Sequence, residues 1–143
     1  MTLTQPDPGP ATAVPVGSGL TGRVVVVTGA SRGLGRSLAQ NLAASGALLG
    51  LLARDGQALD RLAASLPTEA TTVSCDVADP DAVAAAIDRV AARLGGLDSL
   101  VVNAGISPSA RRAHNTPVEV WRQVLDVNLT GQLLAVDGGY GIR

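Results

Sequence analysis

The residues best suited to chemistry form a glycine-rich segment, TGASRGLG, at positions 28–35. Glycines there permit a tight turn and a close approach of the backbone to a ligand. If a helix begins within this segment, its free N–H groups and dipole attract phosphate. The alternative is a plain turn between a strand and a helix. The segment predicts a pyrophosphate site for a dinucleotide, formed by Gly29, Ser31, Arg32, Gly33, Leu34 and Gly35.

Charged residues after the next apolar run bear on which dinucleotide binds. An acidic residue at that point accepts hydrogen bonds from the ribose 2′-hydroxyl and repels a 2′-phosphate. Here Arg54 precedes Asp55, and Arg32 lies in the glycine segment. Guanidinium groups suit a phosphate dianion, so the sequence favours NADP(H), with NAD(H) as the alternative. The other interpretations are a solvated loop charge for Arg54 and a helix N-cap for Asp55.

Side chains that could transfer a proton are few. All eleven positive residues are Arg, so the chain has no Lys. A phenol without a cationic neighbour titrates near pH 10 and is poorly matched to proton transfer at neutral pH. We therefore expect the single Tyr140 to make a tail contact. We also expect His114 to be a solvated loop residue and Trp121 to pack beside its helix. Cys75 is expected to be a buried structural thiol, and no metal-ligand spacing is present.

These residues must be positioned by an alternation of strands and helices. Short apolar runs predict strands at residues 23–28, 47–53, 71–77 and 97–105. Helical periodicity predicts helices at residues 33–45, 56–66, 80–94 and 117–129. Gly46 and Gly95 are placed to end helices, and Asp79 to cap one. The pattern predicts the α/β class, as a Rossmann-like doubly wound parallel sheet.

The amino-acid composition further narrows the class of protein. Residues 1–21 hold half of the prolines and are expected to be a disordered leader, before a dinucleotide-binding domain at residues 22–143. Hydrophobic residues make up 46% and aromatic residues 1%, so the core must be Ala, Val and Leu. The net charge of −1 offers no field for nucleic acid or an anionic membrane. With no long apolar run, we expect a soluble cytoplasmic protein.

The spacing TGxxxGxG resembles the cofactor loop of the short-chain dehydrogenase/reductase family, and four further motifs agree. They are CDV at 75–77, NAG at 103–105, DVNLTG at 126–131 and VDGG at 136–139. The resemblance implies hydride transfer between a nicotinamide and an alcohol or ketone. It also implies cofactor contacts from Asp76, Val77, Asn103, Ala104 and Gly105. Asn128 matches one member of the family's catalytic tetrad.

Two of these motifs overlap in this chain. DVNLTG and LTGQLLAVDGG share Leu129, Thr130 and Gly131. The family's strand with its catalytic Ser, and its Tyr-x-x-x-Lys, have no counterpart between them. The resemblance therefore implies an internally truncated, incomplete sheet of four strands plus a strand-like segment at residues 133–139. Excision between two copies of a short repeat is a hypothesis for the origin of this joint.

Three interpretations stay open at this point: an oxidoreductase, a non-catalytic dinucleotide-binding fragment and a nonfunctional truncation product. The missing segment would also leave the fourth strand as an exposed apolar edge. We expect that edge to support homo- or hetero-oligomers, or to pair with residues 133–139.

Overall fold

A four-stranded parallel sheet forms the centre of the molecule, with the strand order β3-β2-β1-β4. The computed structural model describes residues 19–107 and 113–131. The strands are β1 (Val24–Thr28), β2 (Leu48–Ala53), β3 (Ala70–Ser74) and β4 (Ser99–Val101). The predicted Rossmann-like architecture is confirmed. Most of the expected leader and the expected strand-like segment at 133–139 lie outside the described residues.

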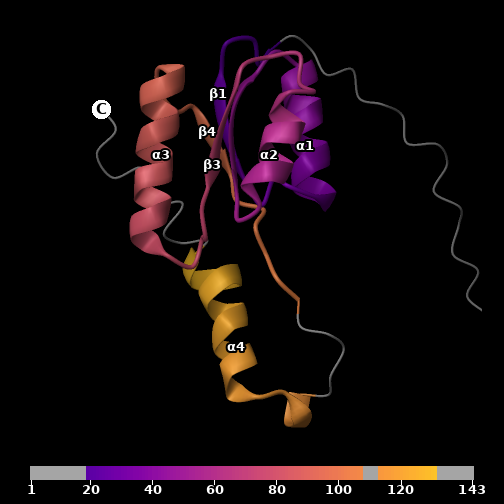
Figure 1. The fold of residues 1–143 in the computed structure, drawn as a ribbon, viewed down its shortest axis with the longest axis vertical. Helices are drawn as coiled ribbons and strands as arrows, with labels where there is room; N and C mark the ends of the chain where they lie inside the picture. The colour runs from indigo at the N-terminus through magenta and orange to yellow at the C-terminus, as the bar shows by residue number, and fades with distance from the viewer. Residues whose placement is uncertain (1–18, 108–112, 132–143) are drawn as a thin grey trace, which may run out of the picture.

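Helices cover both faces of the sheet. Two of them, α1 (Gly33–Ala44) and α2 (Gly56–Ala63), lie on one face, and α3 (Pro80–Leu94) lies on the other (Figure 1). A 3-10 turn, η1 (Ala113–Asn115), precedes α4 (Val118–Leu125), which continues as the π-helical turn η2 (Asp126–Thr130). In Figure 1, α4 extends away from the sheet beyond the ends of the strands.

Alternation along β1 supplies both halves of the core. Val24 and Val26 pack in a cluster that includes Val90 of α3, and Val25 and Val27 pack in a cluster that includes Leu59 of α2. Because both faces are covered, all five residues of β1 are buried. This is the arrangement that a continuous Val run predicts.

Gly50 of β2 lets α3 approach the sheet closely. A Cβ at this position would lie 2.6 Å from Cγ1 of Val90 and 2.8 Å from Cγ2 of Val26. These distances are far inside van der Waals contact, so the packing of α3 depends on the missing side chain.

Helix ends follow the local chemistry of the sequence. The Asp79 carboxylate caps α3 and accepts hydrogen bonds from the amides of Asp81 at 3.0 Å and Ala82 at 3.1 Å. Gly95 ends α3 with a φ of 87°. These two predictions are confirmed. The last helix, α4, begins at Val118, one residue later than expected.

The fourth strand is shorter than predicted, because the end of β1 forms hydrogen bonds with the chain that follows β4. The amides of Asn103 and Ala104 both donate to the Thr28 hydroxyl at 3.0 Å. These hydrogen bonds turn the backbone over the end of β1, so strand pairing stops at Val101. Among the described strands, β4 lies at one edge of the sheet, as expected.

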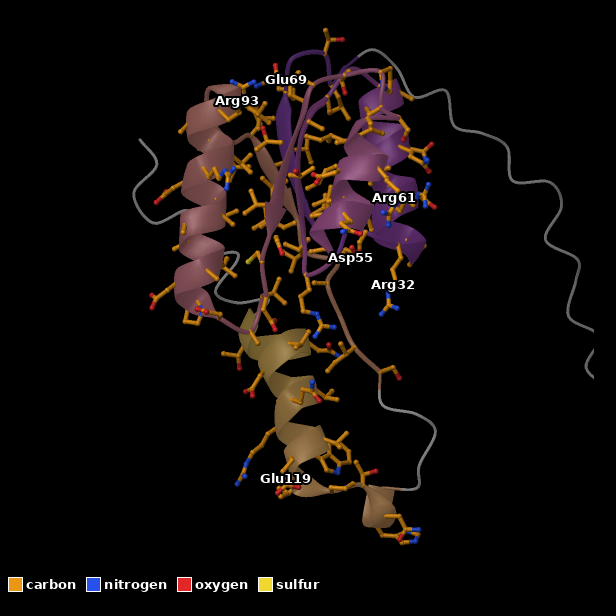
Figure 2. The ribbon with its side chains drawn as sticks, viewed as in Figure 1. Arg32, Asp55, Arg61, Glu69, Arg93 and Glu119 are labelled. Atoms are coloured by element: carbon orange, nitrogen blue, oxygen red, sulfur yellow. The ribbon has the colours of Figure 1, made fainter. Side chains whose placement is uncertain are left out.

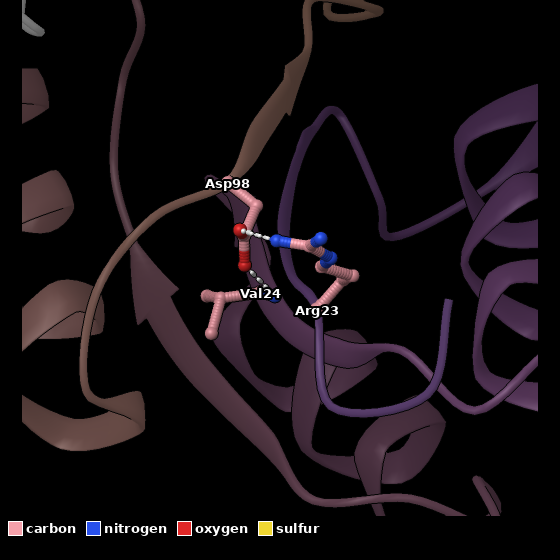
Figure 3. Close-up of polar contacts among 3 residues, drawn as sticks. All are labelled: Arg23, Val24 and Asp98. Atoms are coloured by element: carbon pink, nitrogen blue, oxygen red, sulfur yellow. Dashed lines mark hydrogen bonds and ion pairs between the residues drawn. The ribbon is translucent and has the colours of Figure 1, made fainter. Parts of the chain in front are cut away.

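A clamp at the opposite end joins β1 to the start of β4 (Figure 3). The Asp98 carboxylate accepts hydrogen bonds from the Val24 amide and the Arg23 guanidinium, both at 2.8 Å. The hydrogen bond from Val24, followed by that from Arg23, lowers the pKa of Asp98 below its ordinary value. The clamp therefore favours the charged carboxylate.

Candidate functional site

An open cleft of about 540 Å³ lies at the carboxyl ends of the strands. Its walls come from the loops after all four strands of the described sheet and from η2. The chain crosses from one side of the sheet to the other between β1 and β4, and ligands of parallel sheets bind at such switch points. The cleft is lined by Gly29, Ser31, Arg32, Gly33, Leu34, Ala53, Arg54, Asp55, Cys75, Asp76, Val77, Asn103, Ala104, Gly105, Ile106 and Val127.

The glycine loop is held tightly between α1 and the chain after β4. Gly29 has a φ of +67°, and a Cβ there would lie 2.8 Å from the Ala104 Cα. A Cβ on Gly35 would overlap the Gly29 carbonyl oxygen and lie 2.5 Å from Nδ2 of the Asn103 side chain. Gly35 is buried beneath the loop and does not line the cleft, whereas Gly33 opens onto free space.

The N-terminus of α1 is left without a protein cap. Its N-cap residue, Arg32, makes no side-chain capping bond, and the first turn contains no acidic residue. The N-termini of α2 and α3 are instead capped by Asp55 and Asp79. The first amides of α1 therefore remain for an anion, and Ser31, Gly33 and Leu34 surround them. A Cβ on Gly33 would meet no atom within 4 Å, so the space beside these amides is open, which fits a pyrophosphate.

Two arginines line the cleft beside Asp55. Asp55 accepts a hydrogen bond from the Ala58 amide at 3.0 Å, which confirms the alternative role of N-cap for this residue. Arg32 and Arg54 are exposed, and neither forms an ion pair with any residue that the structure describes. Figure 2 shows Arg32 and Asp55 near the same end of the sheet. Arginine charge is thus available to an anionic ligand while the nearby carboxylate is engaged.

The loop after β3 forms another wall. Asp76 accepts a hydrogen bond from the Ala78 amide at 3.0 Å, which turns the chain toward α3. Cys75 and Val77 are buried in the core and also line the cleft. Burial, and then the charges of Asp76 and Asp79, raise the pKa of the Cys75 thiol. A neutral thiol is a weak nucleophile, which agrees with the structural role expected for Cys75.

The chain after β4 forms the remaining wall. The Asn103 side-chain amide donates to the Thr28 carbonyl at 3.0 Å and the Gly29 carbonyl at 3.4 Å. Asn128 lies in η2 and forms two hydrogen bonds with the backbone of Ile106. Its Nδ2 donates to the Ile106 carbonyl and its Oδ1 accepts from the Ile106 amide, both at 2.8 Å. Both side chains therefore hold loops in place. Asn128 does not line the cleft, although the sequence resemblance implies a catalytic role for it.

Sequence patterns did not identify several residues of the cleft, nor Thr28, which supports the cleft from the end of β1 without lining it. Thr28 anchors two amides, and its place at the end of a Val run was the available signal. Ala53, Ile106 and Val127 are apolar, and only their positions after strands or on a helical turn could have identified them. Trp121 is 48% exposed, so the expected packing is wrong. His114 is exposed, as expected, and Tyr140 lies outside the described residues.

The cleft is lined by neither Tyr nor His, and the sequence contains no Lys. Within residues 19–107 and 113–131, no His, Cys, Asp or Glu cluster could hold a metal ion. No helix in the same ranges is long and apolar enough to cross a membrane. The described cleft combines the uncapped N-terminus of α1 with two arginines, and its other titratable side chains are Asp55, Asp76 and Cys75.

Comparison with known proteins agrees with this geometry. The family model described as short chain dehydrogenase matches residues 23–139. A cis-4-hydroxycyclohexanecarboxylate dehydrogenase from Sinomonas cyclohexanicum is 39% identical over 130 residues, covering 90% of this chain and 51% of that protein. The chain thus spans about half the length of this relative.

Solved structures of the same family superpose on the described fold. NAD⁺-bound xylitol dehydrogenase matches with a TM-score of 0.80 and 31% identity, covering 83% of this chain and 47% of that structure. A metagenomic short-chain oxidoreductase in complex with NADP matches with a TM-score of 0.78 and 36% identity, covering 83% and 55%. The chain, with its glycine loop and parallel sheet, therefore belongs to the short-chain dehydrogenase family of NAD(P)-binding oxidoreductases.

Proposed function

We propose that this chain binds NADP(H) in the cleft and does not, by itself, complete the reaction of its family. The observation that carries the proposal is the uncapped N-terminus of α1 facing a cleft that also holds Arg32 and Arg54. The helix end would receive the pyrophosphate, and the arginines would receive the 2′-phosphate. Asp55 is engaged as the cap of α2, which weakens its competition for the ribose 2′-hydroxyl.

The rest of the cleft would hold the ends of the cofactor. Asp76 and Val77 are assigned to the adenine, and the backbone of Asn103, Ala104 and Gly105 to the nicotinamide half. A bound nicotinamide supplies or accepts a hydride. The protein's own residues would orient the rings and exclude water from the faces they cover. Asn128 would keep the Ile106 backbone in place through its pair of hydrogen bonds.

Reduction of a ketone also needs a proton donor at the carbonyl oxygen. No Lys is present to lower the pKa of a tyrosine, and the only Tyr is Tyr140. The substrate class of the family, alcohols and ketones, is therefore assigned to intact relatives. For this chain we favour the role of a non-catalytic dinucleotide-binding fragment, for which a cytoplasmic location stays a prediction.

The overlap at residues 129–131 supports an internal deletion as the origin of this chain. Gly131 is buried, and a Cβ there would overlap the Val77 carbonyl oxygen. A joint that keeps glycine at this position preserves the contact between η2 and the cleft wall. Alignment of the gene region with an intact homologue tests the origin. A family of full-length proteins that are colinear with this chain and lack the same middle would contradict it.

Calorimetric titration tests the cofactor assignment. We expect saturable binding of NADPH, with weaker binding of NADH. Arg54→Ala should reduce NADPH affinity about tenfold or more, because a hydrogen bond to a charged group contributes about 1.5–3 kcal/mol. Its effect on NADH should stay within about twofold. Arg61→Ala, on α2 and outside the cleft, is the matched control. No saturable heat with millimolar cofactor would favour a nonfunctional truncation product.

A steady-state assay tests the lack of turnover. Purified protein is incubated with NADPH and a panel of ketones, beside an intact relative. We expect cofactor oxidation by the relative only. Sustained oxidation by this chain, unchanged in Tyr140→Phe, would refute the proposal of a non-catalytic fragment while leaving cofactor binding intact.

A further inference from the structure

The outer edge of β3 presents main-chain groups with no strand beside them among the described residues. β3 lies at the edge of the sheet, because the described strands have the order β3-β2-β1-β4. The Glu69 carbonyl accepts a hydrogen bond from β2, and the Cys75 amide donates one to β2, both at 3.0 Å. Main-chain groups alternate in direction along a strand. The amides and carbonyls of Ala70, Thr72 and Ser74 therefore point away from β2.

A groove of about 470 Å³ lies between this edge and α3. The Thr72 hydroxyl donates to Asp60 of α2 at 2.7 Å, so Thr72 faces α2 and its neighbour Thr71 faces α3. The side chains of the groove are small, except for two arginines. The groove is lined by Ala70, Thr71, Thr72, Arg89, Ala92 and Arg93.

The two arginines of the groove lie one helical turn apart. Arg89 and Arg93 are both exposed, and like charges at this spacing repel each other. Arg93 lies in the last turn of α3, where the helix dipole favours a cation, and its Nε is 3.6 Å from a Glu69 carboxylate oxygen (Figure 2). Arg89 lies a turn earlier and forms no ion pair with any residue that the structure describes. Its charge is therefore available to an anionic partner.

The spacing of the arginines fits an extended strand. Four residues of a helix rise about 6 Å along its axis. Alternate residues of a strand, whose side chains share a face, are about 6.7 Å apart. Figure 1 shows α3 running alongside β3. A strand added beside β3 can therefore place two carboxylates, two residues apart, against Arg89 and Arg93.

A second copy of β3 does not fit this edge. If two copies joined their β3 strands into one continuous sheet, a two-fold axis perpendicular to the sheet would bring both α3 helices to the same side. Arg89 and Arg93 of one copy would then face the same arginines of the other copy. Like charges that face each other are destabilising, and charged side chains commonly protect sheet edges in this way. The groove therefore selects an acidic strand and disfavours self-pairing.

We propose that the β3 edge binds an extended peptide segment of another protein, with acidic residues at alternate positions. The segment adds a strand to the sheet through the outward groups of Ala70, Thr72 and Ser74, and its carboxylates pair with Arg89 and Arg93. Because both arginines are exposed, the ion pairs contribute modestly, and the dissociation constant is on the order of 100 micromolar. The groove shares no residue with the dinucleotide cleft, so this binding does not depend on the cofactor.

Fluorescence anisotropy with labelled heptapeptides tests the binding. The probe is Glu-Thr-Glu-Thr-Glu-Thr-Glu. The control, Thr-Glu-Glu-Thr-Thr-Glu-Glu, has the same composition but no two glutamates two residues apart. The alternating peptide should bind about threefold more tightly or better, because two of its carboxylates reach the arginines at once. Equal affinity would overturn strand addition. No saturable binding of the alternating peptide at millimolar concentration would overturn the site itself.

Hydrogen exchange locates the bound peptide. The Thr72 amide points outward and should exchange more slowly when the alternating peptide is bound. The Thr71 amide already points toward β2 and should change little. Slower exchange confined to the first turn of α1 would place the peptide in the cleft and overturn the proposal. N-methylation of the peptide backbone, which keeps its charges, should abolish binding. Retained binding would reduce the site to a simple anion site.

Charge variants test the two arginines. Arg89→Glu should weaken binding of the alternating peptide at least about fivefold, because attraction is replaced by repulsion. Arg36→Glu makes the same change of charge on α1, which packs against β1 and β2, and should have little effect. Circular dichroism checks that each variant keeps its fold. The double variant Arg89→Glu, Arg93→Glu should instead bind the alternating peptide with Lys in place of Glu. Equal losses in Arg89→Glu and Arg36→Glu, or failure of this charge exchange, would overturn the pairing.

Discussion

Gly35 fixes the glycine loop by lacking a side chain. A Cβ at this buried position would overlap the Gly29 carbonyl oxygen and crowd the Asn103 amide. Gly35→Ala should therefore lower the free energy of unfolding by about 1–3 kcal/mol, the usual cost of overpacking. Urea unfolding measures this effect.

A matched glycine supplies the control for this prediction. A Cβ on Gly56 would lie 3.6 Å from the Ser74 Cβ, an ordinary contact. Gly56→Ala should be neutral or stabilise the fold by about 0.5 kcal/mol, since alanine restricts the unfolded chain. Equal destabilisation by the two substitutions would show that the packing beneath the glycine loop is looser than described.

Asp98 makes the stability depend on pH. Its pKa in the folded state lies below the ordinary value, so its contribution is complete above the unfolded pKa of about 4 and is lost as pH falls through the folded pKa. Asp98→Asn should lower the free energy of unfolding at pH 7, and the difference from the unmodified protein should shrink below about pH 4. Salt should reduce the difference as well, because the group is exposed.

Unfolding curves at several pH values measure this effect. Asp88→Asn, at an exposed position of α3, is the control and should change little across the range. A constant difference between Asp98→Asn and the unmodified protein from pH 3 to pH 7 would mean that the clamp does not depend on charge.

Thr28 joins β1 to the chain after β4. Its hydroxyl accepts two amide hydrogen bonds at 3.0 Å, and the residue is 1% exposed. Thr28→Val keeps the shape and leaves both amides without this acceptor. The expected cost is about 1–3 kcal/mol, with faster hydrogen exchange at Asn103 and Ala104.

Another threonine tests whether the effect belongs to this junction. The Thr72 hydroxyl of β3 donates to the exposed Asp60 carboxylate at 2.7 Å. Thr72→Val should cost less, because water can replace that bond. Unchanged hydrogen exchange at Asn103 and Ala104 in Thr28→Val would contradict the role of the Thr28 hydroxyl in joining β1 to the chain after β4.

The sequence predicted those elements whose causes are local. The Val run, the Asp79 cap and the glycine stop at Gly95 each act within a few residues, and the structure contains all three. The early end of β4 was missed because its cause, the Thr28 hydroxyl, lies 75 residues away in the chain. The exposure of Trp121 was missed for a related reason. Periodicity identifies the apolar face of α4 but not the surface that this face meets.

The same distinction applies to the candidate site. The predicted cofactor-binding residues other than Gly35 line one cleft, because the motifs follow the strand ends where parallel sheets bind ligands. Apolar lining such as Ala53, Ile106 and Val127 has no comparable signal in the sequence.

Cys75 can report the effect of cofactor binding on the whole fold without any enzymatic activity. It is the only cysteine, it is 5% exposed, and it lines the cleft beside Asp76. A thiol reagent should therefore label the native protein slowly, at a rate set by opening of the cleft or of the fold.

A dinucleotide bound as proposed would cover this wall and would also stabilise the folded state. At a cofactor concentration of about 100 times Kd, the stabilisation is about 2.7 kcal/mol, which corresponds to about 100-fold slower labelling. NADPH should protect Cys75 at lower concentration than NADH, and Arg54→Ala should remove that difference. If Arg54→Ala left the protection by NADPH unchanged, the assignment of the 2′-phosphate to Arg54 would be wrong. Dinucleotide binding itself would still be supported.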